Sequence, residues 1–236
     1  MGIFGLLTLD VQARSGTVRT LDGIVHEGNV ILSPIGGLLV TLADGRTALV
    51  PVANIANAKF DSPANGFTNV TYRYIVFRNG SVLPARIERA TAEGLTLESF
   101  GKKLTVSILD VAGILNQPGN PNQIPAFANG RLGALLRTGD FIDGEFSGGD
   151  NSRVSISTIL FGPRRLDWDK DCKAVILRAL PENASRYYVR LANGITLASK
   201  AAPGIGAGDG LVVLDSILGE SRVQFNEILE IRTPPR

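Results

Sequence analysis

The 236-residue chain has one cysteine, one histidine, one methionine and one tryptophan, and only 6% of its residues are aromatic. A single cysteine excludes an intrachain disulfide framework and a cysteine-rich zinc site. A single histidine removes most chemistry that depends on imidazole groups. No apolar run approaches the ~18 residues that a membrane-spanning helix requires, so the sequence predicts no membrane span.

A strong charge of either sign is also missing. Lys and Arg number 24, Asp and Glu number 22, and the net charge is +2. The chain as a whole is therefore not built to capture nucleic acid or an anionic membrane by electrostatics. What is present is 44% hydrophobic residues, 27 glycines and 12 prolines. This composition favours many short strands joined by tight turns over long helices.

The most informative feature is an internal repeat. Four short apolar segments each end at a turn glycine, and these glycines recur at nearly equal spacing: Gly23, Gly80, Gly139 and Gly194. Downstream of each turn, further glycines separate segments in which apolar and polar residues alternate. Alternation with a period of two indicates strands with one buried and one exposed face.

Each repeat contains signals for five short strands in about 45 residues, which is marginal for an independent core. The predicted units span 1–60, 73–116, 131–178 and 187–232, and the first includes an additional N-terminal strand. The units either form separate small barrels or pair into larger sheets. The turn-rich segment 116–125 between the second and third units is the expected hinge between two halves.

The segment 136–146, which reads LRTGDFIDGEF, resembles the opening of an Sm-like or SH3-like small β-barrel. The resemblance implies an all-β fold of four tandem five-stranded barrel repeats. Tandem units of this kind are also similar to non-catalytic modules of large exported bacterial proteins, which implies an exported or cell-surface location. No unit carries both loop elements that Sm proteins use to bind RNA, so the resemblance does not extend to that activity.

Few residues are candidates for catalysis. Nothing in the sequence places the only thiol, Cys172, beside the only imidazole, His26, as a nucleophilic pair requires. The acidic segment 167–171 (DWDKD) lacks the later ligands of a calcium loop, and its alternation places Trp168 inward. The carboxylates of Asp140, Asp143 and Glu145 are interpreted as solvated strand residues. We therefore predict no catalytic residue, no cofactor and no metal site.

The sequence leaves three classes of function open. The preferred hypothesis is a non-enzymatic scaffold whose strand edges bind other protein chains or copies of itself. The alternative is an Sm-type nucleic-acid-binding module that uses Arg164 and Arg165 beside Trp168. A carbohydrate-binding module is the second alternative, and it would need exposed aromatic residues.

Overall fold

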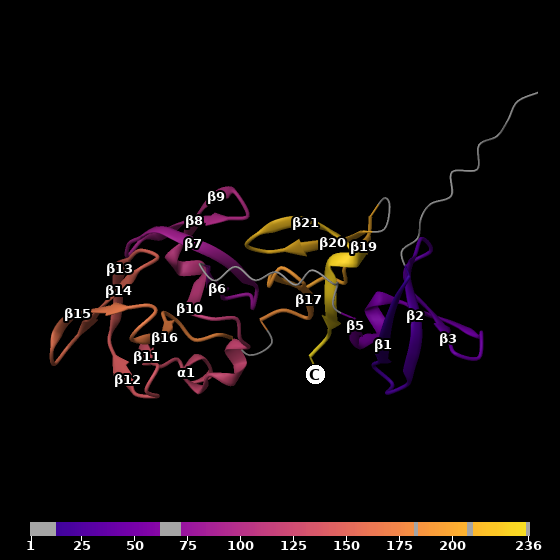
Figure 1. Cartoon of the computed structure of the whole chain (residues 1–236), viewed down its shortest axis with the longest axis horizontal. Helices are drawn as coiled ribbons and strands as arrows, with labels where there is room; N and C mark the ends of the chain where they lie inside the picture. Colours follow the sequence, from indigo (N-terminus) through magenta and orange to yellow (C-terminus); the bar gives the residue numbers. More distant parts are fainter. Residues whose placement is uncertain (1–12, 62–71, 182–183, 207–209, 235–236) are drawn as a thin grey trace, which may run out of the picture.

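The computed structural model describes residues 13–61, 72–181, 184–206 and 210–234, and it confirms the all-β prediction. In these described residues, twenty-two short strands form antiparallel pairs that link into one network. The molecule is elongated along one axis (Figure 1). Within this described part, no helix is long and apolar enough to cross a bilayer. The N-terminal strand expected in the first unit lies outside the described residues.

The first stretch of strands shows how every unit is arranged. Strand β1 pairs with β2 on one side and with β5 on the other, β2 pairs with β3, and β3 pairs with β4. A short 3-10 helix, η1 (Val52–Asn54), leads from β4 into β5. The strand bounds are β1 (Arg14–Thr20), β2 (Val25–Ser33), β3 (Gly37–Leu42), β4 (Thr47–Val50) and β5 (Ile55–Phe60).

The second stretch has the same order of pairings. Its first strand pairs with the second and the last, the second pairs with the third, and the third pairs with the fourth. The helix η2 (Ile108–Asp110) precedes its last strand. Its strands are β6 (Arg73–Phe77), β7 (Val82–Ala90), β8 (Gly94–Ser99), β9 (Lys102–Ser107) and β10 (Val111–Leu115).

The third and fourth stretches keep this order of pairings, but in each of them the second strand is divided into two shorter strands. The third contains β11 (Gly133–Leu136), β12 (Phe141–Asp143), β13 (Glu145–Gly149), β14 (Arg153–Thr158), β15 (Gly162–Asp167) and β16 (Cys172–Ile176). The fourth contains β17 (Tyr187–Leu191), β18 (Thr196–Ser199), β19 (Gly204–Ile205), β20 (Gly210–Asp215), β21 (Gly219–Gln224), η4 (Phe225–Glu227) and β22 (Ile228–Arg232).

The turn after the first strand of each stretch has the same hydrogen bonds in all four places. In the first turn, the N–H of Thr20 donates to the carbonyl of Ile24, and the N–H of Gly23 donates back to Thr20. Equivalent pairs of bonds close the turns at Phe77–Ser81, Leu136–Asp140 and Leu191–Ile195. The turn glycines all have φ between 88° and 97°, a left-handed conformation that glycine adopts at little cost. The four glycines singled out by the sequence therefore share one structural role.

Among the described residues, none of the four stretches closes into a hydrogen-bonded barrel. Within the described residues, β4, β9, β15 and β21 each pair along one side only. The last strands instead pair between stretches, β5 with β22 and β10 with β16. The first stretch is thereby joined to the fourth, and the second to the third.

This pairing divides the molecule into two lobes with shared cores. Lobe A, residues 14–60 and 187–232, has one cluster of buried side chains drawn from both of its stretches. Lobe B, residues 73–176, has a second cluster built in the same way. A third cluster in lobe B buries Phe127 of the short helix α1 (Pro125–Ala128). The expected hinge at 116–125 contains the short 3-10 helix η3 (Pro121–Gln123) and leads directly into α1, and β10 and β16 on either side of it pair directly.

The two lobes meet at a polar joint around Asp215, which is 5% exposed. Asn79 donates to its Oδ1 over 2.7 Å, and the Ser81 hydroxyl donates to its Oδ2. The backbone N–H groups of Ile217 and Leu218 also donate to Oδ1. Strand β7 of lobe B and β18 of lobe A pair beside this cluster. The hairpin of β20 and β21 in lobe A is therefore fixed onto lobe B.

Candidate interaction surfaces

The predicted contact residues Arg164 and Arg165 both lie exposed on β15. In the ladder with β14, Arg164 lies opposite Ile156 and Arg165 opposite Ser155. Because successive side chains in a strand point to opposite faces, the two guanidinium groups do not form one continuous patch. The structure thus brings the two arginines to the surface without joining them.

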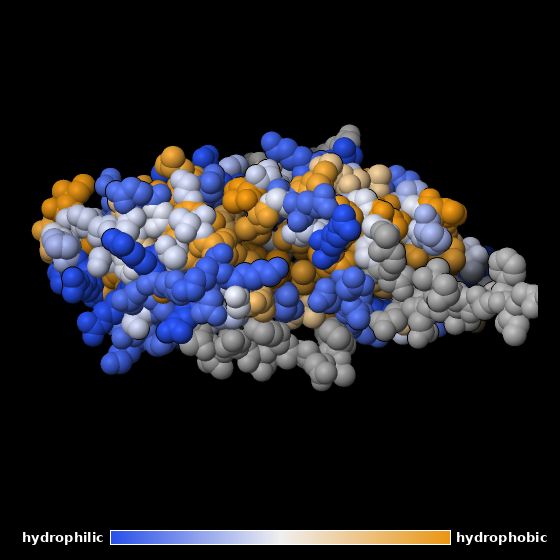
Figure 2. Space-filling view, turned by 90° about the horizontal axis from the view of Figure 1, so that it is seen from above, coloured by the Kyte–Doolittle hydropathy of each residue, from blue (hydrophilic) through white to orange (hydrophobic). Residues whose placement is uncertain are grey.

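The turn that precedes the arginines carries the most exposed apolar side chains of the described chain. Ile159 is 100% exposed, Leu160 is 83% exposed and Phe161 is 68% exposed. The guanidinium of Arg164 lies over the Phe161 ring, 5.3 Å from its centroid. Figure 2 shows apolar side chains at this end of the elongated molecule. The sequence interpretation missed this tip, although three large apolar residues directly before a turn glycine are an available signal.

Trp168 is not available to stack on a base, because it is 1% exposed. Its indole N–H donates to the carbonyl of Asp150 over 3.1 Å, and the guanidinium of Arg73 lies 5.8 Å from its ring. Trp168 lies in the turn after β15 and not within a strand, but it points inward as predicted. Trp168 therefore does not provide a stacking surface beside Arg164 and Arg165.

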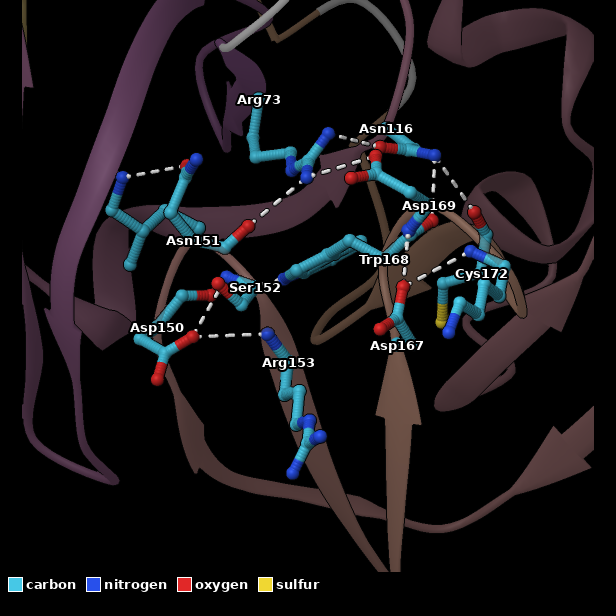
Figure 3. Close-up of polar contacts among 12 residues, drawn as sticks. Arg73, Asn116, Asp150, Asn151, Ser152, Arg153, Asp167, Trp168, Asp169 and Cys172 are labelled. Atoms are coloured by element: carbon cyan, nitrogen blue, oxygen red, sulfur yellow. Dashed lines mark hydrogen bonds and ion pairs between the residues drawn. The ribbon is translucent and has the colours of Figure 1, made fainter.

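Arg73, 4% exposed, is the centre of a buried network that joins β6 to the third stretch (Figure 3). Its Nη1 donates to Oδ1 of Asn116 over 2.5 Å, and its Nη2 donates to the carbonyl of Asn151 over 3.0 Å. The same Nη2 lies 3.1 Å from Oδ1 of Asp169. Asn116 in turn donates to the carbonyls of Trp168 and Cys172. These bonds hold two neighbouring stretches together, which is a structural role.

The acidic segment at 167–171 forms a turn stabilised by its own backbone. The carboxylate of Asp167 accepts hydrogen bonds from the N–H groups of Lys170 and Asp169, and these bonds lower its pKa, with Lys170 the largest cause. Asp171 accepts from the N–H of Asp167 over 2.8 Å. Across the described residues, no group of three or more His, Cys, Asp or Glu side chains is placed to hold a metal ion.

The carboxylates near β12 are also occupied by neighbouring side chains. Arg131 donates to both oxygens of Asp143, each over 2.7 Å, and this bidentate pair lowers the pKa of Asp143. The hydroxyl of Thr138 donates to Asp140 over 2.8 Å. A general acid needs a carboxyl with a raised pKa, and the Asp143 shift has the opposite direction.

The only thiol lies inside the core of lobe B. Cys172 is 0% exposed, and burial raises its pKa to about 12. A nucleophilic cysteine needs the opposite shift, because the thiolate is the reactive form. His26 lies on β2, in lobe A. The two residues therefore lie in different lobes.

A groove of about 1000 Å³ lies between the two lobes, lined by Tyr74, Tyr188, Arg190 and Arg232 among others. Its cationic groups already have partners. Arg190 lies 3.2 Å from Glu230, and the guanidinium of Arg232 lies 4.9 Å from the Tyr188 ring centroid. These two guanidinium groups of the groove are therefore already engaged by neighbouring side chains.

The unpaired strand edges differ in charge. Three of them carry charged residues, namely Lys102 and Lys103 on β9, Arg164 and Arg165 on β15, and Glu220 and Arg222 on β21. Charged side chains on an edge discourage pairing with other strands. Strand β4 reads TALV and carries no charge, and its Leu49 is 41% exposed. Among these four edges, β4 is the one best suited to accept a strand.

Comparison with protein-family models, with curated proteins and with solved structures finds no match to this chain.

Proposed function

We propose that this chain is a non-enzymatic scaffold, built of four small barrel-like units, that binds other protein chains at an uncovered strand edge. Four turns with the same hydrogen bonds and four units with the same order of pairings support the repeated unit. The inaccessible thiol and the paired carboxylates support a role in binding. The exported location implied by the family resemblance stays a prediction.

The uncharged edge of β4 carries the proposal. An uncovered edge presents backbone N–H and carbonyl groups that an added strand can satisfy. The side chains on β4 neither repel an incoming strand nor block it, whereas β9, β15 and β21 each carry at least two charges. We therefore place the binding edge on β4, with Leu49 as the apolar contact.

The hairpin register shows which groups of β4 face outward. The N–H of Leu42 donates to the carbonyl of Arg46, so residues 42 and 46 form a hydrogen-bonded pair. Such pairs alternate along an antiparallel ladder, which makes Val40 and Ala48 the next one. The N–H of Leu49 then points away from β3, toward the open edge.

This register provides a matched pair of variants. Leu49→Pro removes the outward N–H without breaking the β3–β4 ladder, and Leu49→Ala keeps that N–H while removing the side chain. The tagged chain is purified from its native host after nuclease treatment, and the ratio of bound polypeptide to chain is measured. Leu49→Pro should reduce this ratio at least tenfold, and Leu49→Ala should reduce it less.

Equal retention by both variants would contradict strand addition at β4. Salt-sensitive retention of RNA that Arg164→Ala with Arg165→Ala abolishes would instead favour the nucleic-acid alternative. The opposed faces of these two arginines and the buried Trp168 count against that alternative. A carbohydrate-binding module needs exposed aromatic rings, but Trp168 is buried and the exposed Phe161 ring is partly covered by the guanidinium of Arg164.

A further inference from the structure

Two hairpins of the chain have the same register but very different surroundings. Strands β20 and β21 close at the pair Asp215 and Gly219, and β14 and β15 close at the pair Thr158 and Gly162. Each hairpin therefore has a tip of three residues. In the first tip, Ile217 and Leu218 are partly buried against the core of lobe B. The tip formed by Ile159, Leu160 and Phe161 is exposed.

The surface that receives the covered tip also has an uncovered counterpart. Asp215, which closes the covered tip, accepts a hydrogen bond from Ser81 in the turn of the second stretch, where Ser81 is 0% exposed and Val82 is 7% exposed. In the first stretch, the residues at the same distance from the turn glycine are Ile24 and Val25, and both are 53% exposed. Leu21 of this turn is also 53% exposed.

A tip and a turn at the positions of those in the joint thus occur a second time, and there both are apolar and exposed. The free tip belongs to lobe B, and the free turn belongs to lobe A. Figure 1 places the β14–β15 hairpin and the β1–β2 sheet at opposite ends of the molecule. A tip at one end and a receiving turn at the other make a heterologous pair of surfaces, which joins molecules head to tail.

The charges beside the two surfaces are complementary. Arg164 and Arg165 are exposed next to the free tip. The free turn carries Asp22 and, at the start of β2, Glu27, both exposed, against one cation, Arg19. Complementary charges favour association in one orientation, and tip-to-tip contact would bring arginines of the two copies together.

We propose that the partner of the free tip is a second copy of this chain, and that the 159–161 tip of one copy docks on the 20–25 turn of the next. The contact uses the positions of the joint between the lobes, but with Ile24 in the place of Ser81 and Thr158 in the place of Asp215, so it is apolar where that joint is polar. Because the tip and the turn of one copy contact two different copies, the product is an open chain of copies. This inference goes beyond the proposed function and does not use the β4 edge.

The test uses two variants of the full chain in sedimentation velocity. Leu160→Asp blocks the tip, and Ile24→Asp blocks the turn. The unmodified chain should give a mass that rises with concentration past that of a dimer. Each variant alone should remain monomeric, whereas an equimolar mixture should form a species of two chains and no larger one, because only one intact tip and one intact turn remain for each pair.

Ile35→Asp is the matched control, because Ile35 is 80% exposed in the turn at the far end of β2. It should associate like the unmodified chain. Unchanged far-ultraviolet circular dichroism shows that each variant is folded.

Three results would overturn the proposal. They are an unmodified chain that is monomeric at every concentration, self-association that persists in Ile24→Asp alone, and a chain that binds phosphatidylserine vesicles through Leu160 but not itself. In the first case, the Leu49 variants still test the scaffold independently, since they leave both the tip and the turn intact.

Discussion

At the residue scale, Arg73 shows how a buried polar group joins two stretches of the chain. Its guanidinium donates hydrogen bonds to the side chain of Asn116 and to the carbonyl of Asn151. A buried acceptor that loses its donor costs about 1–3 kcal/mol, and hydrogen bonds to charged groups are at the upper end of this range. The residue therefore contributes to stability, and not to chemistry at a surface.

Replacing Arg73 by methionine should lower the free energy of unfolding by about 2–3 kcal/mol, since it keeps the apolar packing but removes both donors. Urea denaturation measures this change. Asp169→Asn is the control, because the Asp169 side chain is 75% exposed and its ion pair should contribute less than about 1 kcal/mol. Equal losses in the two variants would show that the exposed ion pair, and not the buried hydrogen bonds, carries the stability.

The raised pKa of Cys172 gives a prediction with a definite sign. The folded thiol has a pKa of about 12, and the thiol of the unfolded chain has an ordinary value near 9. Between these values the unfolded state releases a proton that the folded state keeps, so rising pH favours unfolding. The stability supplied by the buried thiol is complete below about pH 9 and is lost between about pH 9 and 12.

Two measurements check this prediction. The native thiol should resist alkylation at pH 8 and react fully once the chain is unfolded in urea. Replacing Cys172 by alanine should make the fall in stability between pH 9 and 11 less steep than in the unmodified chain. Rapid alkylation of the native protein at pH 8 would contradict the burial on which both expectations rest.

At the element scale, the strands could be predicted from the sequence because alternation and turn glycines are local signals. The inward direction of Trp168 and the left-handed turn glycines follow from such signals. The pairing of β5 with β22 could not be predicted in this way. Each unit has several strands with a similar alternation of apolar and polar residues. This alternation does not specify which strand pairs with which strand of another unit. The tip at 159–161 was missed because apolar residues in a turn were not treated as a surface signal.

The central pairing in lobe B depends on a glycine. Gly113 lies in β10 between β6 and β16, opposite Val76 on one side and Ile176 on the other. A Cβ at this position would lie 2.5 Å from the carbonyl oxygen of Val175 and 2.6 Å from the Phe127 ring. A side chain of any size would therefore push the two strands or α1 apart.

Gly113→Ala should lower the stability by about 1–3 kcal/mol, as overpacking of a filled core does. Thermal denaturation followed by circular dichroism checks the loss. Gly119→Ala is the matched control, since the only atom within 4 Å of its Cβ is the carbonyl oxygen of Gln117 at 3.9 Å. A neutral Gly113→Ala would mean that β10 and β16 are less closely paired than described.

At the scale of the whole molecule, the chain order does not determine which units are neighbours. Consecutive units were expected to form the two halves, but lobe A joins the first stretch to the last, and lobe B forms from the two in between. The segment expected to be a hinge leads directly into α1, whose Phe127 ring is buried in the core of lobe B. Because the four units are similar and evenly spaced, local sequence signals do not distinguish which units pair. The pairing of units depends on long-range packing.

The same architecture leaves an apolar tip and an apolar turn exposed at opposite ends of the molecule, and these are the two surfaces proposed to join copies of the chain. Hydrogen exchange measured by mass spectrometry at low and at high chain concentration tests whether these two surfaces meet. We expect the amides of 20–25 and 158–162 to exchange more slowly at high chain concentration, while the exchange of those in the control turn at 34–36 does not change. Exchange that is independent of concentration in both segments, or slowed only elsewhere, would contradict the proposed contact.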